Sequence, residues 1–110
     1  MSTDMKLSER HCRPLPKGTP ALAPAEISVL LGELVGWASK GGTIRRTYTF
    51  GNYGETMAFV NAVAWIAQRE DHHPDISFSY NRCEVAFSTH SIDGISMNDF
   101  ICAAKIEALF

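Results

Sequence analysis

The amino-acid sequence predicts an α+β fold, in which an antiparallel β-sheet of about four strands has three helices packed on one face. Three segments carry apolar residues at helical spacing, and three others alternate apolar and polar residues. They follow one another as helix, strand, helix, strand, strand, helix, and a short extra strand near Trp37 would bring the sheet to four strands. A chain of 110 residues fits one domain.

We expect residues 1–22 to form an extended N-terminal arm and residues 23–110 to form the folded domain. Residues that interrupt helices and central strands recur in the arm, namely Pro14, Pro16, Gly18 and Pro20. His11 and Cys12 could supply half of a metal site, but no second ligand pair lies nearby at a suitable spacing. We therefore expect both to be solvated residues of the arm.

The first helix is predicted to begin at Pro24, a favourable first-turn residue, and to stop near Gly36. Its apolar face follows the i, i+3, i+4, i+7 pattern through Ile27, Leu30, Leu31 and Leu34. After a Gly-Gly turn, residues 43–50 alternate, with β-branched and aromatic side chains that favour a strand.

The second helix is predicted over residues 53–70, with Asn52 as its N-terminal cap. It carries two apolar stripes, one of Phe59, Val63 and Ile66 and another of Val60, Ala64 and Ala67, and Trp65 widens this surface. A helix that is apolar on two sides needs two covers. The sheet can supply one, and we expect a second copy of the chain to supply the other.

A β-hairpin is predicted next, with strands over 75–80 and 83–90 joined at Asn81-Arg82. Ser88 and His90 would share one face of the returning strand, because side chains alternate with period two. Ser96 then opens the last helix, with Asp99 three residues on as a variant of the capping box.

Composition and charge exclude several classes of function. A formal charge of −2 and a pI near 6.0 do not favour nucleic acid or an anionic membrane surface as a partner. No stretch of about twenty apolar residues could span a bilayer, and the first residues do not resemble a secretory leader. The three cysteines are an odd number without CxxC spacing, so we expect reduced thiols and a cytoplasmic protein.

Three of the four histidines, His72, His73 and His90, fall within nineteen residues of one another. Histidine has an ordinary pKa near neutrality, so this cluster suggests proton transfer or a metal site. A metal needs three or four converging ligands, and adjacent histidines rarely aim both rings at one ion, so we expect no metal. Acid–base catalysis needs only that the imidazoles reach a bound substrate. The remaining alternative is that these histidines are surface or capping groups.

The histidines stand within a series of short motifs, namely Asp71-His72-His73-Pro74, Tyr80-Asn81, Ser88-Thr89-His90, Gly94 and Asp99. With these motifs, from about Pro24 to the C-terminus, the chain resembles the pterin-4a-carbinolamine dehydratase family. His11-Cys12-Arg13 and Asn98-Asp99-Phe100-Ile101 are similar to its bacterial members. One departure is Gln68, because the family often carries an acidic residue at that place, four positions before the first histidine. This departure bears on any carboxylate contribution from that turn of the helix.

The resemblance implies dehydration of 4a-hydroxytetrahydrobiopterin to quinonoid dihydropterin and water, without a cofactor of the enzyme's own. This reaction recycles the cofactor of aromatic amino acid hydroxylases, to which a functional link would follow. His72 and His90 would be the acid–base pair, and His73 would orient the pterin. Asp71, Ser88 and Thr89 would contact the ring.

Two further residues have alternative interpretations. Trp37 is interpreted equally well as an apolar wall of the pterin site and as a core residue. Asp99 is interpreted as the cap of the last helix. The family is typically dimeric or tetrameric, so a homodimer or homotetramer is expected. The alternative function is a non-catalytic protein-interaction module like a dimerisation cofactor, which would tolerate the loss of all three histidines.

Overall fold

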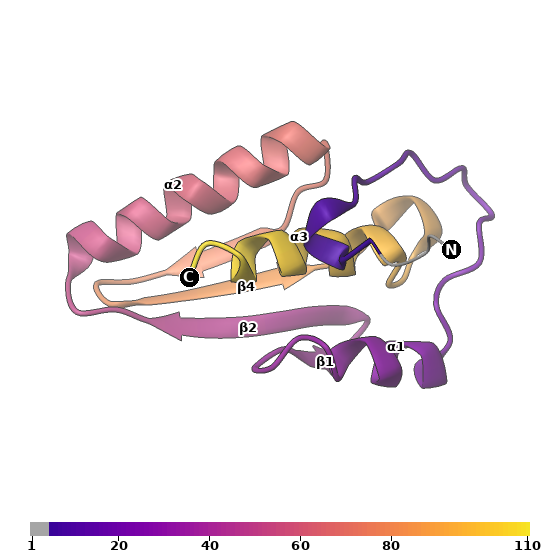
Figure 1. Cartoon of the computed structure of the whole chain (residues 1–110), viewed down its shortest axis with the longest axis horizontal. Helices are drawn as coiled ribbons and strands as arrows, with labels where there is room; N and C mark the ends of the chain where they lie inside the picture. Colours follow the sequence, from indigo (N-terminus) through magenta and orange to yellow (C-terminus); the bar gives the residue numbers. More distant parts are fainter. Residues whose placement is uncertain (1–4) are drawn as a thin grey trace.

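The structure is a computed structural model that describes residues 5–110. Its helices and strands follow in the order η1 (Leu7–Glu9), α1 (Pro24–Leu31), β1 (Ala38–Lys40), β2 (Thr43–Thr49), α2 (Tyr53–Glu70), β3 (Asp75–Phe78), β4 (Arg82–Phe87), η2 (His90–Ile92) and α3 (Met97–Glu107). The strands form one antiparallel sheet in the order β1-β2-β4-β3. The helices α2 and α3 run along this sheet, and α1 lies beside β1 (Figure 1). The predicted α+β class is confirmed, and β1 is the short strand expected after Trp37.

The helix at the centre of the molecule is α3, which is buried on almost every side. Its buried residues are Asn98, Asp99, Phe100, Ile101, Cys102, Ala103, Ala104 and Ile106. The sequence predicted its start correctly, because Ser96 accepts from the N–H of Asn98 and Asp99 completes the capping box. The helix contacts both α2 and η1. In its first turn, Asp99 meets His72, which follows α2, and Asn98 meets Arg13 of the N-terminal arm.

The helix α2 buries one stripe and part of the other. Its buried residues are Thr56, Phe59, Val63 and Ala67. In the second stripe Ala67 is buried and Val60 is half-buried, but Ala64 is exposed. Trp65 beside it is 64% exposed, so this chain alone does not cover all of the apolar surface. Self-association through that surface therefore stays a prediction. Asn52 caps the helix as expected, accepting from the N–H of Glu55 at 2.9 Å.

The first helix is shorter than the sequence predicts, because it ends at Leu31 and not near Gly36. The chain tightens at this point into turns in which the N–H of Leu34 bonds the carbonyl of Leu31 at 3.0 Å. This turn brings Leu34 into the core. Gly36 has a φ of +95°, and a Cβ there would lie 2.7 Å from the Arg46 guanidinium, so glycine is required for a different reason than a helix stop.

The returning strand of the hairpin is also shorter than predicted, because β4 ends at Phe87. Beyond it, Thr89 and Gly94 exchange backbone hydrogen bonds of 2.8 and 3.3 Å, which close a tight loop. His90 lies in that loop as the first residue of η2 and is exposed. The prediction that Ser88 and His90 share one strand face is therefore wrong, since neither belongs to the strand.

Glu107, at the end of α3, gathers three donors from the sheet side of the core. Its carboxylate accepts from Trp37 Nε1 at 3.0 Å, from Arg46 at 2.8 Å and from the hydroxyl of Tyr48. Burial, and then the neighbouring Glu107, raise the pKa of Tyr48. This cluster joins the C-terminal turn of α3 to the first half of the chain.

We expect Glu107→Ala to destabilise the fold by about 2 kcal/mol, because it leaves three partly buried donors without their acceptor. Urea unfolding of the variant and of wild type measures the difference. Glu33→Ala is the matched control, since Glu33 is exposed. Equal unfolding midpoints for wild type and Glu107→Ala would contradict this account.

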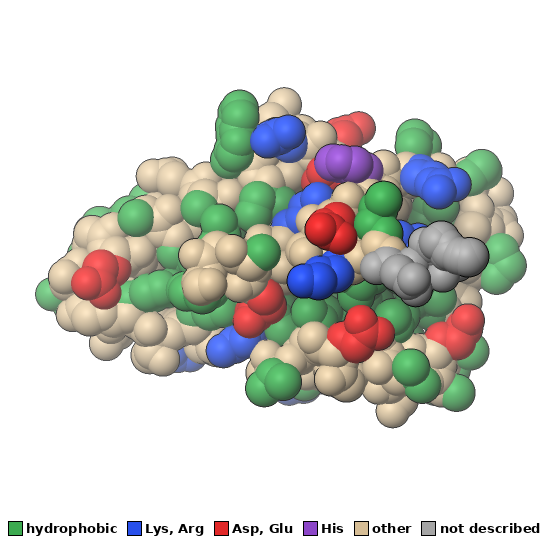
Figure 2. All heavy atoms as spheres, viewed as in Figure 1, with side chains coloured by type: hydrophobic (Ala, Val, Ile, Leu, Met, Phe, Trp, Pro, Cys, Tyr) green, Lys and Arg blue, Asp and Glu red, His purple; other side chains and the backbone are tan. Residues whose placement is uncertain are grey.

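Two surface features complete the description of the fold. On the face drawn in Figure 2, acidic and basic side chains lie interleaved and not in separate patches. Within residues 5–110, no helix combines the length and the apolar character that are needed to cross a bilayer.

Candidate active site

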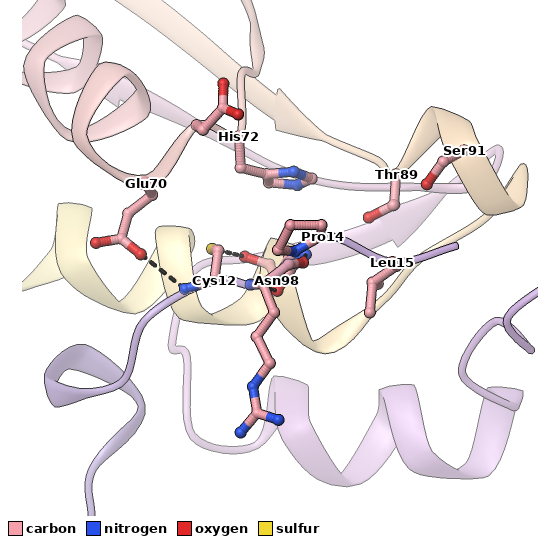
Figure 3. A pocket seen from close by; sticks show the side chains of 10 residues that line it. Cys12, Pro14, Leu15, Glu70, His72, Thr89, Ser91 and Asn98 are labelled. Atoms are coloured by element: carbon pink, nitrogen blue, oxygen red, sulfur yellow. Dashed lines mark hydrogen bonds between the residues drawn. The ribbon is translucent and has the colours of Figure 1, made fainter. Parts of the chain in front are cut away.

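A cavity of about 260 Å³ lies where the N-terminal arm passes the end of α2 and the start of α3 (Figure 3). Ten residues line it: Cys12, Arg13, Pro14, Leu15, Glu70, Asp71, His72, Thr89, Ser91 and Asn98. A larger cavity of about 480 Å³ beside α1 has no titratable side chain in its lining. A third cavity, of about 350 Å³, is lined by His11, but that side chain is 74% exposed. We take the cavity at His72 as the candidate site, because its histidine is nearly buried and paired with a carboxylate.

His72 is placed in this cavity by the way α2 ends. Asp71 adopts a left-handed conformation with φ 51°, and the N–H of His72 bonds back to the carbonyl of Ala67 at 3.1 Å. The imidazole stacks on Phe87 with the ring centroids 5.9 Å apart. Its Nε2 lies 2.5 Å from Oδ1 of Asp99, and its side chain is 12% exposed. The ring is therefore fixed on one side and faces the cavity on the other (Figure 3).

Asp99 holds the imidazole as well as capping α3. Its second oxygen accepts from the backbone N–H of Ser96 at 2.8 Å and from the Thr89 hydroxyl at 2.9 Å. The carboxylate is fully buried and only accepts, so it assigns the Nε2 proton to His72. Within residues 5–110, Nε2 is the one ring nitrogen of His72 in a hydrogen bond. Nδ1 is therefore the ring nitrogen left for a ligand.

The interpretation of Asp99 as a helix cap is confirmed but incomplete. Because its carboxylate has two oxygens, the same side chain can cap α3 and orient His72. Thr89 is buried, and its hydroxyl donates its one hydrogen bond to Asp99. In the 2.6 Å contact between the Thr89 and Ser96 hydroxyls, Ser96 is therefore the donor. Thr89 thus supports the carboxylate, a contact that sequence spacing did not indicate.

The structure brings together only some of the residues that the sequence singled out. Asp71, His72 and Thr89 line the cavity. His73 and His90 are exposed and Ser88 is half-buried, and none of the three is among the lining residues.

Trp37 is a core residue in the structure. It is 6% exposed and stacks on Phe87, which also stacks on His72. Its indole N–H donates to Glu107. Its connection to the cavity therefore runs through Phe87, and of the two interpretations the structure shows the core one.

The expectation that His11 and Cys12 are merely solvated is wrong for Cys12. The N–H of Cys12 donates to Glu70 at 2.7 Å, and its thiol lies 3.5 Å from that of Cys102. His11 Nδ1 lies 2.9 Å from the same Glu70 carboxylate, although the His11 side chain remains 74% exposed. These contacts hold the arm against the cavity. They join residues 58 and 59 positions apart, so no local pattern could indicate them.

Glu70, and not the residue at position 68, supplies the carboxylate on this turn of α2. Gln68 is exposed, whereas the Glu70 side chain is 7% exposed. Burial works to raise the pKa of Glu70, but the Cys12 N–H, His11 and Lys105 together outweigh it and lower that pKa. A carboxyl whose folded-state pKa is lowered stabilises the fold above its unfolded pKa, and this contribution disappears as the pH falls through the folded value.

We therefore expect Glu70→Gln to destabilise the protein at neutral pH and to lose that effect in acid. The ordinary pKa of glutamate is about 4.3, so the two unfolding curves should converge as the pH falls below roughly 4. Urea unfolding of both proteins at a series of pH values measures this. A difference in unfolding free energy that stays constant down to the acid limit would contradict the assignment.

Comparison with known proteins identifies the family of this chain. A family model described as pterin 4 alpha carbinolamine dehydratase matches residues 20–109. The chain belongs to this family. Among the dehydratase's relatives, a protein from Nitrosospira multiformis, provisionally named pterin-4-alpha-carbinolamine dehydratase, is 55% identical over 104 residues, which cover 94% of this chain and 92% of that one. A protein of the same provisional name from Chromobacterium violaceum is 56% identical and covers 96% and 97%.

Solved structures agree with the fold of this dehydratase. The crystal structure of a transcriptional coactivator/pterin dehydratase from Brucella melitensis matches with a TM-score of 0.78 and 30% identity, over 82% of this chain and 98% of that chain. A pterin dehydratase-like RuBisCO assembly factor matches with a TM-score of 0.56 and 23% identity, over 66% and 84%, and shows the fold alone. The resemblance inferred from the histidine motifs is confirmed.

Proposed function

We propose that this dehydratase, a hydro-lyase, removes water from 4a-hydroxytetrahydrobiopterin in the cavity beside His72 and releases quinonoid dihydropterin. The observation that carries the proposal is the pairing of His72 with the buried Asp99 at the wall of a small cavity. About 260 Å³ is small for a ligand site and suits a compact bicyclic ring. Among residues 5–110, no group of three or more His, Cys, Asp or Glu side chains could hold a metal ion. The proposed reaction uses no metal ion.

The reaction needs one proton delivered and one removed. The hydroxyl on C4a leaves as water when it gains a proton, and the adjacent ring nitrogen loses a proton as the new double bond forms. An imidazole serves either step near neutral pH, and such a group contributes about 10²–10⁴-fold. With Nε2 held by Asp99, Nδ1 of His72 is the atom that would exchange the proton with the pterin.

We assign the second proton-transfer group to His90. It immediately precedes Ser91, which lines the cavity, and its side chain is exposed. His73 follows His72 and would orient the pterin from the mouth of the cavity, with Asp71 and Ser88 as further polar contacts. Trp37 has no direct contact with the pterin in this proposal, because it lies in the core.

The experiment is a dehydration assay with the purified full chain. 4a-Hydroxytetrahydrobiopterin is generated in place, and the appearance of quinonoid dihydropterin is followed by absorbance against the uncatalysed rate. Acceleration by wild type, and a loss of about tenfold or more on replacing His90 by alanine, are expected. No acceleration by folded wild-type protein would overturn the proposal.

A protein-interaction function is the second candidate, favoured by the name of the Brucella melitensis relative and by the exposed Trp65 on α2. It would need no histidine, so binding to a protein partner should survive the replacement of His72, His73 and His90 together. The same apolar surface supports a homodimer or homotetramer. We place the enzyme in the cytoplasm, supported by its three free thiols, and link it to an aromatic amino acid hydroxylase through its product.

A further inference from the structure

The N-terminal arm supplies much of the cavity that the proposed function uses. Four of the ten lining residues, Cys12–Leu15, come from it. In Figure 3, Cys12, Pro14 and Leu15 lie across the cavity from His72 and Thr89. Without the arm, the cavity would be open on the side opposite the imidazole.

The first clamp on the arm is Glu70, the last residue of α2. One carboxylate oxygen accepts the N–H of Cys12 at 2.7 Å, and the other lies 2.9 Å from His11 Nδ1. Lys105 on α3 lies 3.8 Å from the same carboxylate and donates to the carbonyl of Ser8 at 2.9 Å. A nearly buried carboxylate with these partners is costly to leave unpaired, so it holds the arm firmly.

The second clamp is Asn98, at the start of α3. Its amide oxygen accepts the N–H of Arg13 at 3.1 Å, and its amide nitrogen donates to the Arg13 carbonyl at 2.7 Å. The Asn98 side chain is buried, and both of its polar atoms form hydrogen bonds with the backbone of a single arm residue. The two clamps therefore hold residues 11–13, directly before Pro14 and Leu15 in the cavity lining.

We propose that residues 12–15 are a fixed wall of the pterin pocket, and that Glu70 and Asn98 are positioning residues which act through this wall. The inference rests on the proposed function. Pro14 and Leu15 would cover the pterin face that is turned away from His72, and the preformed wall spares the ligand the entropy of ordering the arm. Glu70 binds the Cys12 N–H and His11, and Asn98 binds the Arg13 backbone. Since both hold the arm and not the reacting atoms, they contribute to binding of substrate and transition state alike.

Loss of uniform binding raises KM and leaves kcat unchanged. We expect Glu70→Ala and Asn98→Ala each to raise KM for 4a-hydroxytetrahydrobiopterin by about tenfold, with kcat within about twofold of wild type. Two matched controls should keep the wild-type KM. Glu55→Ala removes an exposed carboxylate on the same helix that also accepts a backbone N–H, that of Gly51, and Asn61→Ala removes an exposed amide.

A rescue experiment separates the wall from a merely structural effect of these substitutions. The thiols of Cys12 and Cys102 lie 3.5 Å apart, and a disulfide would bring them to about 2 Å and tie the arm to α3. The oxidant is diamide, a diazene that takes two electrons and two protons from the thiols and becomes a hydrazine while one S–S bond forms. Peptide mapping and an intact mass lower by two hydrogen atoms identify the product.

Oxidation of the Glu70→Ala variant is expected to restore KM to within about threefold of wild type, because the tether replaces the lost clamp. The double variant Glu70→Ala, Cys102→Ser cannot form the tether, so diamide should leave its KM raised. If the wild type is active, two results would contradict the proposal that residues 12–15 form a wall of the pocket. One is an unchanged KM in both clamp variants. The other is a raised KM that the verified disulfide does not lower. An inactive wild type would instead remove the proposed function.

Discussion

Replacing His72 by glutamine is expected to lower kcat/KM for the dehydration by about 10²–10⁴-fold. Glutamine retains an N–H that can reach the buried Asp99, so this carboxylate keeps a partner and the protein should remain folded. What glutamine lacks is a group that gains and loses a proton near neutral pH. The loss should therefore appear in kcat, because the proton is transferred only as the hydroxyl leaves.

The measurement compares kcat and KM of wild type, His72→Gln and His72→Ala under saturating pterin. His72→Ala also removes the partner of Asp99, so it should lose stability as well as activity. Agreement between the two variants in rate, together with a difference in unfolding midpoint, would separate chemistry from folding. If the folded glutamine variant keeps more than a tenth of the wild-type kcat, His72 is not a proton-transfer group in the reaction.

Replacing Asp99 by asparagine is expected to lower kcat by about 10²-fold and to destabilise the fold by roughly 1–3 kcal/mol. The asparagine amide can donate to Nε2, which would put the imidazole proton on Nδ1 and present the wrong tautomer to the pterin. The stability loss has a separate origin: the amide oxygen still accepts from Ser96 and Thr89, but a neutral oxygen forms weaker hydrogen bonds than the carboxylate does.

Ser96→Ala is the comparison that divides these two effects. It removes the serine cap of α3, at about 1 kcal/mol, while the contact between Asp99 and His72 remains. Its loss of kcat should be much smaller than that of Asp99→Asn. If the two variants lose kcat in proportion to their loss of stability, Asp99 acts only as a cap and does not orient His72.

The parts of the fold that the sequence predicted are those set by neighbouring residues. Asn52 and the Ser96–Asp99 capping box form their contacts within one helical turn. The two helix starts can therefore be predicted from the local sequence. The alternation over residues 43–50 likewise follows burial, with Ile44 and Tyr48 in the core. The fold class follows from the order of such segments.

The parts that sequence missed depend on contacts between distant segments. The helix α1 ends at Leu31 because Leu34 turns into the core, and His90 leaves the sheet because Thr89 pairs with Gly94. Periodicity along a segment carries no information on either event. The arm is held by Glu70 and Asn98, which lie 58 and 85 positions from Cys12 and Arg13. Its place in the cavity lining therefore could not be predicted from the sequence.

The candidate site was predictable in its chemistry but not in its boundary. The His-His-Pro and Ser-Thr-His motifs identified the family, and His72, Asp71 and Thr89 do line one cavity. Asp99 was interpreted as a cap, because a capping box explains an acidic residue at that position without any further partner. Its second oxygen, which meets His72, acquires a partner only in the folded chain.

The central claim is that a pterin lies against His72, in the cavity walled by Cys12–Leu15. The most direct test is a crystal structure of the full chain with bound 7,8-dihydrobiopterin. The account predicts the ring in that cavity, with C4a facing the imidazole and a ring heteroatom within about 3.5 Å of Nδ1. A ring bound elsewhere, with Nδ1 of His72 out of hydrogen-bond reach, would contradict it.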